Sequence, residues 1–295
     1  MRFEGVFVAN VTPFDSKGNV LTEGLENHLS FLADRGVQGF VPCGTTGEAA
    51  TLNLEEWRNV IATTKKFAAA RGLKTIAGCG GNCTWMVLER LREAKELGCD
   101  AALVVTPYYN KPTSAGVIAH YEHLADQGTL PIILYNVPSR TNVSLSADTV
   151  ARLFAHPNIV GLKEASGQYS HWLDLASRLD LSTKALLAGD DDAFVTMRAL
   201  GGSGIISASA NLVPEHFVRL HAFTSAGQWQ EAFHLQKRLH PLIRSMFAET
   251  NPAPVKYALS RLGLVDDRLR LPLVPVGTET RALVDRSLRE LELLT

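Results

Sequence analysis

The chain has 295 residues, 46% of them hydrophobic, and its 29 basic and 30 acidic side chains leave a formal net charge of -1. This balance excludes the basic stripe that nucleic-acid binding requires, and no apolar stretch is long enough to span a membrane. The first residues lack the basic and apolar regions of a signal peptide, so we expect a cytoplasmic protein.

Short apolar segments alternate with longer segments of helical period. The predicted strands cover residues 6–9, 39–42, 74–77, 101–105, 132–135, 159–163, 185–188 and 204–207. The predicted helices between and after them cover residues 23–35, 54–71, 84–97, 114–127, 147–154, 169–179, 191–200 and 214–225. Continuous apolar strands that each precede a helix favour an α/β fold, a closed (β/α)8 TIM barrel. An open flavodoxin-like sheet is the rival, although it would not normally need eight strands.

The pattern changes after residue 225, where only helical segments follow. These are predicted at 228–247, 254–262 and 278–293, and proline-rich segments separate them. We therefore predict two domains, a catalytic barrel at 1–225 and a C-terminal helical domain at 226–295.

Lys163 ends the predicted strand 159–163. Desolvation at the end of a buried strand favours the neutral amine, which can attack a carbonyl, so Lys163 is a candidate Schiff-base nucleophile. The alternative is a lysine that reaches solvent and pairs with Glu164. Tyr135 ends the preceding strand, and at an equivalent height its phenol would lie within proton-transfer reach of the amine.

The second predicted strand is followed by a loop with the sequence G-T-T-G-E at 44–48. The hydroxyls of Thr45 and Thr46, together with exposed backbone N–H groups, can hold a carboxylate. A plain turn before a helix is an equally good interpretation. We expect Glu48 to be structural, accepting hydrogen bonds within this loop.

Two further strand exits carry polar groups. Tyr108 and Tyr109 stand between two prolines after the fourth strand, where rigid phenols suit proton relay or subunit packing. Arg140 follows the fifth strand and can bind a carboxylate through two parallel hydrogen bonds, although it could also be an ordinary surface arginine.

Metal binding is weakly indicated. The acidic triplet 190–192 resembles a metal site, but it also begins a predicted helix, where carboxylates favour the helix dipole, and we prefer that interpretation. His120 and His123 have helical spacing without an evident third ligand. We expect neither a metal nor a cofactor.

Taken in order, several motifs resemble those of the dihydrodipicolinate synthase family, in the pyruvate-dependent class I aldolase superfamily. They are G-T-T-G-E at 44–48, Y-Y at 108–109, Y-N-V-P-S-R-T at 135–141, G-L-K-E-A at 161–165, G-D-D at 189–191, G-I-I-S at 204–207, N-P-A-P-V-K at 251–256 and L-R-L-P-L at 269–273. The resemblance runs nearly end to end.

The resemblance implies a homotetramer, a dimer of dimers, that condenses pyruvate with L-aspartate 4-semialdehyde in lysine and diaminopimelate biosynthesis. In such an enzyme Lys163 forms the imine and Tyr135 transfers protons. The resemblance also implies a proton relay through Thr45 and Tyr109, with Thr46 as the other candidate relay threonine. Thr46 would bind the carboxylate of pyruvate, and Arg140 would bind that of the semialdehyde. Gly189 and Ile206 would contact the substrate through their backbone, and Tyr108 would lie at a subunit interface.

The chain also departs from the family pattern. Lysine-inhibited members carry histidines where this chain has Leu54 and Trp57, and a glutamate where it has Met86. Apolar groups cannot pair with the charges of lysine, so we expect weak or absent feedback inhibition. Two other functions stay open: an aldolase or lyase for a sugar acid or hydroxy-oxo acid, and a non-catalytic oxo-acid-binding protein.

Overall fold

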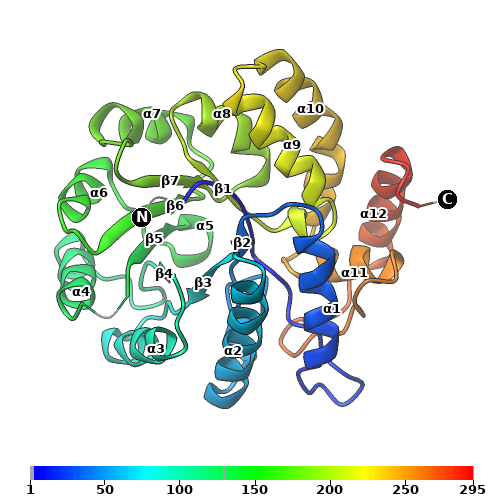
Figure 1. Ribbon diagram of the computed structural model, residues 1–295, viewed down its shortest axis with the longest axis horizontal. Helices are drawn as coiled ribbons and strands as arrows, with labels where there is room; N and C mark the ends of the chain where they lie inside the picture. The colour runs from blue at the N-terminus through cyan, green and yellow to red at the C-terminus, as the bar shows by residue number, and fades with distance from the viewer. Residues whose placement is uncertain (1–2, 129, 295) are drawn as a thin grey trace.

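A computed structural model describes residues 3–128 and 130–294, and within them eight parallel strands close into a barrel (Figure 1). Strand order follows chain order, and β1 completes the ring by pairing with β8. The predicted TIM barrel is confirmed and the open sheet was wrong. The strands are β1 Gly5–Val8, β2 Gly39–Phe40, β3 Lys74–Gly78, β4 Ala101–Val105, β5 Ile132–Asn136, β6 Ile159–Glu164, β7 Ala185–Ala188 and β8 Gly204–Ser207.

A ring of helices surrounds the strands, and each helix follows its strand in the chain. They are α1 Thr22–Ala33, α2 Leu54–Ala70, α3 Thr84–Glu96, α4 Ser114–Asp126, α6 Ala147–Phe154, α7 Tyr169–Arg178, α8 Phe194–Ala199 and α9 Pro214–Ser225. The strand-exit loops also hold short elements that periodicity does not predict: α5 Pro138–Thr141 and the 3-10 turns η1 Ala49–Thr51, η2 Asp191–Ala193 and η3 Ser209–Asn211.

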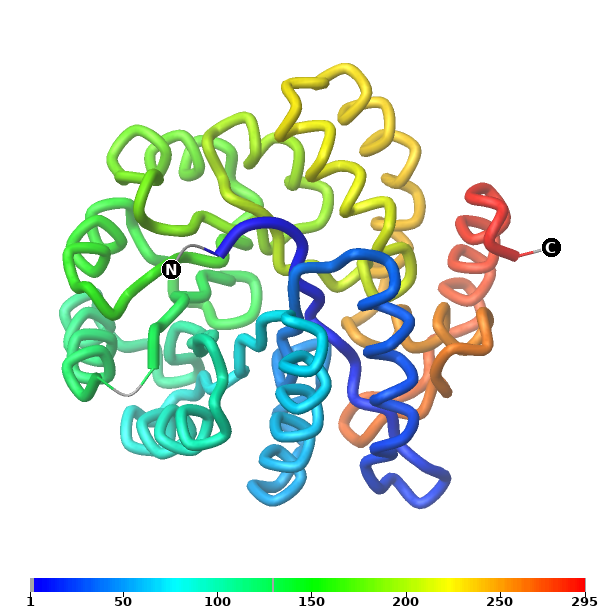
Figure 2. Tube along the Cα trace, in the orientation of Figure 1, coloured from blue at the N-terminus to red at the C-terminus, as the bar shows by residue number. Residues whose placement is uncertain are grey.

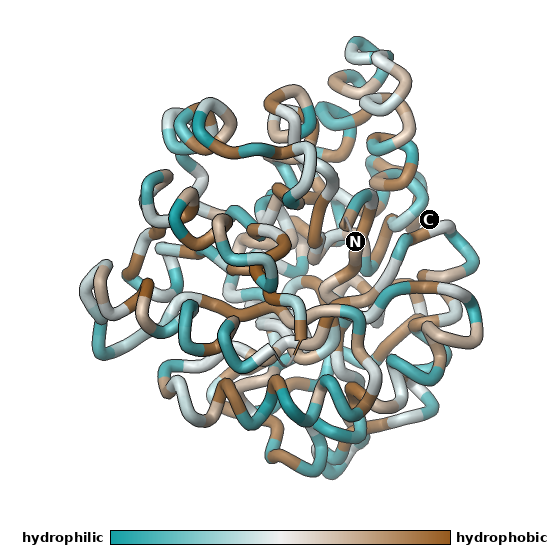
Figure 3. Tube along the Cα trace, turned by 60° about the vertical axis from the view of Figure 1, so that its left-hand side comes forward, coloured by the Kyte–Doolittle hydropathy of each residue, from teal (hydrophilic) through white to brown (hydrophobic). Residues whose placement is uncertain are grey.

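Side chains alternate between the two faces of each strand, as the period of a β-strand requires. Outward-facing residues such as Leu134 and Leu162 belong to the large core between strands and helices, whereas Phe7, Leu103 and Leu187 fill the barrel interior. Figure 3 shows hydrophobic and hydrophilic residues alternating around the turns of the outer helices, as expected for helices with one buried face. The alternation along β6 directs Lys163, next to Leu162, toward the inside of the barrel.

The pairing of β5 with β6 contains an irregularity near the start of both strands. Ile132 pairs with Ile159, but the next residue, Ile133, pairs with Gly161, so Val160 has no partner in the ladder. This is the pattern of a β-bulge, which inserts one extra residue into one strand. Beyond it the register is regular as far as Asn136 and Glu164.

Three helices follow the barrel: α10 Trp229–Met246, α11 Ala253–Arg261 and α12 Thr278–Glu290. Helix α10 packs on α9, and α12 packs on α10 and α11. The segment after α11 runs beside the N-terminal loop before α1, as Figure 2 shows in orange and blue. The boundary between residues 225 and 226 stays a prediction.

A buried ion pair joins the C-terminal segment to the second strand-exit loop. Lys256 Nζ lies 2.5 Å from Glu48 Oε1, and neither side chain is exposed. Lys256 also donates to the carbonyl of Arg268 at 2.7 Å, and the backbone N–H of Arg270 donates to Glu48 at 3.2 Å. Glu48 is thus structural, but the partners of its carboxylate come from α11 and from the segment after it, and not from its own loop.

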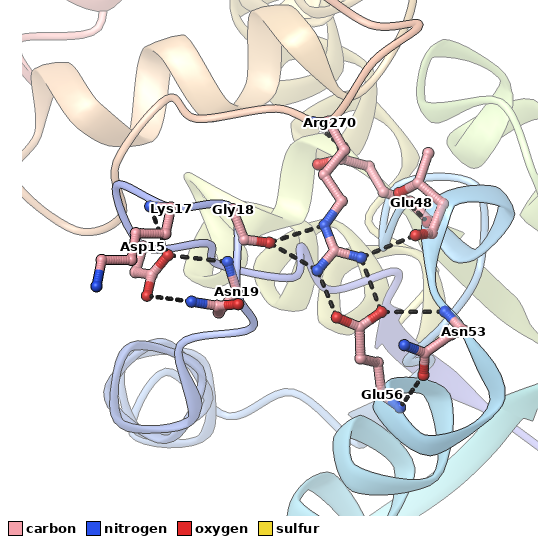
Figure 4. Close-up of polar contacts among 9 residues, drawn as sticks. Asp15, Lys17, Gly18, Asn19, Glu48, Asn53, Glu56 and Arg270 are labelled. Carbon is pink, nitrogen blue, oxygen red and sulfur yellow. Dashed lines mark hydrogen bonds and ion pairs between the residues drawn. The ribbon is translucent and has the colours of Figure 1, made fainter.

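Arg270 extends this contact to the N-terminal part of the chain. Its guanidinium donates to the carbonyl of Gly18 and to both carboxylate oxygens of Glu56 (Figure 4). A third acceptor is the carbonyl of Thr51. One arginine therefore fastens the segment after α11 to the loop before α1 and to the start of α2.

Across residues 3–128 and 130–294, no helix is both long enough and apolar enough to cross a membrane.

Breaking the buried ion pair on one side is expected to destabilise the fold. Lys256→Met leaves the Glu48 carboxylate buried without its cation, which costs about 3–5 kcal/mol of unfolding free energy. Adding Glu48→Gln removes the orphaned charge and should recover most of that loss. Denaturant unfolding measures both variants, with Lys66→Met on the exposed face of α2 as control. Equal losses in the single and double variants would contradict a charge-based cause.

Candidate active site

Lys163 and Tyr135 lie side by side inside the barrel. They are direct partners in the ladder between β5 and β6, as predicted from their places at the ends of neighbouring strands. The amine of Lys163 lies 4.4 Å from the centre of the Tyr135 ring. Both residues are buried, with 7% and 8% of their surface exposed.

Burial controls the protonation of Lys163. Mainly because of desolvation, the pKa of its amine is lowered to about 8; Asp191 and Asp190 oppose the shift, and the nearby Arg140 guanidinium adds to it. About a tenth of the amine is neutral at pH 7 with such a pKa. Lys163 thus combines a shielded position with a usable fraction of the nucleophilic form.

Glu164 does not neutralise Lys163. The strand alternation turns its side chain to the other face, where it accepts hydrogen bonds from Asn136 Nδ2 at 2.8 Å and from the Ser166 backbone at 2.7 Å. Among the described residues, no carboxylate forms an ion pair with Lys163. The alternative of a solvent-exposed lysine paired with Glu164 was wrong.

Tyr135 is connected to the threonine loop. Burial raises the pKa of its phenol to about 12, although the neighbouring Arg140 guanidinium and Thr45 hydroxyl favour the ionised form. The phenol is therefore neutral at physiological pH, holding a proton that it can give and recover. Thr45 itself is exposed, at the mouth of the site, so the pair forms a path from the interior toward solvent.

Thr46 is the buried member of the threonine pair. Its hydroxyl oxygen accepts a hydrogen bond from Asn251 Nδ2 at 2.9 Å, and the residue lines the same cavity as Lys163. Both threonines therefore reach the site, but with different partners: Thr45 contacts Tyr135 and Thr46 contacts the C-terminal extension.

The two consecutive tyrosines point in different directions. Tyr108 lines a pocket of this chain together with Tyr135, whereas Tyr109 is 88% exposed and lines none of the cavities at the site. The backbone at Tyr109 is left-handed, with a φ of 74°, and the phenol stands out from the surface. Within one chain, the structure therefore does not bring Tyr109 to Lys163 and Tyr135, and its part in the proton relay stays a prediction.

Arg140 and Gly189 are at the cavity, and Ile206 is beneath it. Arg140, exposed on α5, lines the Lys163 cavity and the neighbouring pocket. Gly189 also lines the cavity, and a Cβ there would come within 2.7 Å of the Ala165 side chain, so only glycine fits. Ile206 belongs to the buried layer inside the barrel and does not appear among the cavity-lining residues.

The acidic triplet does not cap a helix through its side chains. No side-chain capping bond forms at η2, and the Asp191 carboxylate is instead buried and accepts the Ser209 backbone N–H at 2.8 Å. Asp190 lines the Lys163 cavity, and burial raises its pKa to about 6. In the described part of the chain, no three His, Cys, Asp or Glu side chains converge as metal ligands would.

The cavity around Lys163 is small, about 120 Å³. It adjoins a pocket of about 470 Å³, with which it shares Tyr135, Arg140 and Asn251 in its lining. Cofactor and drug sites usually measure roughly 300–1,000 Å³, so the inner cavity suits a molecule of a few atoms. Asn251 was not assigned a role from the sequence, although the proline-flanked break at 251–254 marked its position.

The arrangement can form and break an imine. A desolvated amine supplies the nucleophile, a neutral phenol supplies and removes protons, and hydroxyl and guanidinium groups at the rim can bind carboxylates. These are the requirements for carbon–carbon bond chemistry on a small 2-oxo acid.

Comparison with known proteins agrees with this chemistry. A protein of Methanosphaerula palustris named 4-hydroxy-tetrahydrodipicolinate synthase is 43% identical over 282 residues, covering 95% of this chain and 96% of its own. One of the same name from Thermodesulfovibrio yellowstonii is 43% identical over 99% of both chains. The dihydrodipicolinate synthase of Acinetobacter baumannii, solved with pyruvate, superposes with a TM-score of 0.95 at 40% identity and covers 99% of both chains. Residues 2–291 match the model of the dihydrodipicolinate synthetase family, and the chain belongs to that family.

Proposed function

We propose that this protein is a 4-hydroxy-tetrahydrodipicolinate synthase, which condenses pyruvate with L-aspartate 4-semialdehyde through an imine on Lys163. The observation that carries the proposal is the buried Lys163 amine in direct register with Tyr135. The names of the full-length relatives supply the substrate class.

The reaction follows from the properties of the site. The neutral Lys163 amine adds to the C2 carbonyl of pyruvate, and loss of water from the carbinolamine gives the imine. Removal of a methyl proton gives an enamine, whose carbon attacks the aldehyde. The amino group of the adduct then displaces Lys163 and closes the ring. Tyr135, which lines the cavity with Lys163 and Thr45, carries the protons of these steps.

Carboxylate binding orients the two substrates. Thr46, buried in the cavity wall, and the neighbouring backbone bind the carboxylate of pyruvate. Arg140 at the rim binds the carboxylate of the semialdehyde, since its guanidinium can form two parallel hydrogen bonds. Gly189 contributes through its backbone, because the chain can approach the ligand there without a side chain.

We infer that the active enzyme is a homotetramer in which Tyr109 completes the site of a neighbouring copy. Its exposed phenol cannot serve the relay of its own chain, but it is presented outward at the mouth of the barrel. A dimer of dimers needs two separate contact surfaces, and two groups among the exposed apolar residues support this proposal. One group comprises Leu54, Trp85 and Met86 at the starts of α2 and α3 with Tyr108 after β4, and the other comprises Tyr169 and Leu173 on α7.

We also propose that lysine does not inhibit the enzyme. Leu54 and Met86 expose apolar side chains where a charged effector would need partners. The indole N–H of Trp57 is already donated to the carbonyl of Gly78 at 2.9 Å. Titration of the condensation rate with lysine should leave it unchanged, and inhibition at micromolar lysine, about -8 kcal/mol of binding, would contradict this proposal.

Borohydride reduction in the presence of pyruvate is expected to attach a three-carbon adduct to Lys163 alone, identified by peptide mass spectrometry. Lys163→Ala should show no adduct and no turnover. Steady-state rates with L-aspartate 4-semialdehyde, sialic acid and deoxygluconate-type sugar acids should then favour the semialdehyde. A labelled enzyme that prefers a sugar acid would support the lyase alternative, and an unlabelled Lys163 would exclude both enzymes.

The rate of imine formation should rise with pH and level off above about pH 8, because only the neutral amine attacks. Asp190→Asn should move the midpoint to lower pH, since Asp190 stabilises the ammonium form, and Arg140→Met should move it to higher pH. Quenching single turnovers of pyruvate with borohydride measures the rate. Midpoint shifts in the reverse directions would contradict the assignment of these charges.

Complementation between inactive variants tests the role of Tyr109. Tyr109→Phe should lower kcat by about 10²-fold, as expected for loss of a proton-transfer group. Unfolding and refolding it together with Lys163→Ala should restore activity, because mixed assemblies contain sites with both native residues. No recovery in mixtures whose mixed assembly is verified by native mass spectrometry would place Tyr109 outside the neighbouring site.

A further inference from the structure

Asn251 lies at the junction of the C-terminal extension and the active site. It follows α10 and precedes α11, and its side chain is 5% exposed. It lines both the Lys163 cavity and the adjoining pocket, although it is 205 positions from its hydrogen-bond partner Thr46. No part of the proposed mechanism uses it.

The hydrogen bond between the two residues has a direction. The amide nitrogen of Asn251 carries only hydrogens, so at 2.9 Å it donates and Thr46 Oγ1 accepts. A hydroxyl has a single hydrogen, and among the described residues no acceptor takes the one on Thr46. Because Thr46 lines the cavity wall, that hydrogen is available to an acceptor bound inside.

The other end of the Asn251 amide points to the same conclusion. Its Oδ1 is buried, and no hydrogen-bond donor reaches it among the described residues. An unpartnered buried carbonyl is unfavourable in itself. Among the described residues, the hydrogen bond from the amide nitrogen to Thr46 is therefore the one side-chain contact that orients the Asn251 amide.

We propose that Asn251 is a positioning residue that fixes the Thr46 hydroxyl as a hydrogen-bond donor toward the carboxylate of the oxo-acid substrate. The inference rests on the proposed function. It assigns the C-terminal extension a part in substrate binding: α10 and α11 hold the amide, the amide orients the hydroxyl, and the hydroxyl binds the carboxylate.

Steady-state kinetics in pyruvate, at saturating semialdehyde, tests the proposal. Asn251→Ala should raise the pyruvate KM about tenfold and leave kcat within about twofold, because the hydroxyl loses its direction while Lys163 and Tyr135 are untouched. Asn251→Asp should raise KM further. Its carboxylate can only accept, so it takes the Thr46 hydrogen and repels the substrate anion.

A double-mutant cycle tests whether Asn251 affects the pyruvate KM through the Thr46 hydroxyl. In a Thr46→Val background, Asn251→Ala should change the pyruvate KM by less than about twofold, because no hydroxyl is left to orient. Arg270→Lys is the matched control, since it weakens the docking of the same extension at Gly18 and Glu56, away from the cavity. It should lower the melting temperature without raising the pyruvate KM.

The outcomes separate the two proposals. An unchanged KM in Asn251→Ala, or an equal rise with and without the Thr46 hydroxyl, would overturn the role of Asn251. Borohydride trapping at saturating pyruvate provides the independent readout. If wild-type Lys163 is not labelled, the proposed function fails; if every variant is labelled and KM is unchanged, only this inference fails.

Discussion

The chemistry of the site depends on the desolvation of the Lys163 amine. An ammonium group enclosed by the barrel loses its hydration, and this loss shifts its equilibrium toward the neutral form. The same enclosure raises the pKa of Tyr135, so the neighbouring phenol stays protonated. A barrel closed by its own strands thus prepares a nucleophile and a proton carrier together. Two acidic groups, Asp191 buried behind the site and Asp190 in the cavity wall, moderate the shift of the lysine pKa.

The parts of this protein that could be predicted from sequence are those determined locally or by the symmetry of the fold. Continuous apolar segments identified the strands, because both faces of a parallel barrel strand are buried. The barrel fold then predicts that Tyr135 and Lys163 lie next to each other, because consecutive strands are neighbours and their ends lie at the same height. The carboxylate-binding loop around Thr45 and Thr46 was likewise found from its position at a strand exit.

The parts that could not be predicted depend on how distant segments dock. Glu48 was expected to bind within its own loop, yet its cation is Lys256, and Asn251 reaches Thr46 from the same extension. No periodicity in the sequence reports such contacts. The exposed position of Tyr109 could not be predicted for another reason: it lies in a loop where its backbone conformation is left-handed. The acidic triplet was expected to cap a helix, but the Asp191 carboxylate instead accepts a hydrogen bond from the buried N–H of Ser209.

The unpaired Val160 has a consequence for how the enzyme can diverge. Side chains alternate along a strand, but the bulge absorbs the extra residue, and β6 resumes its pairing with β5 in register from Gly161 onward. Deleting Val160 would make the pairs Ile132–Ile159 and Ile133–Gly161 consecutive, so Lys163 would stay opposite Tyr135 and keep facing the cavity. The start of β6 can therefore lose one residue without displacing the nucleophile, because the irregularity absorbs the change in length.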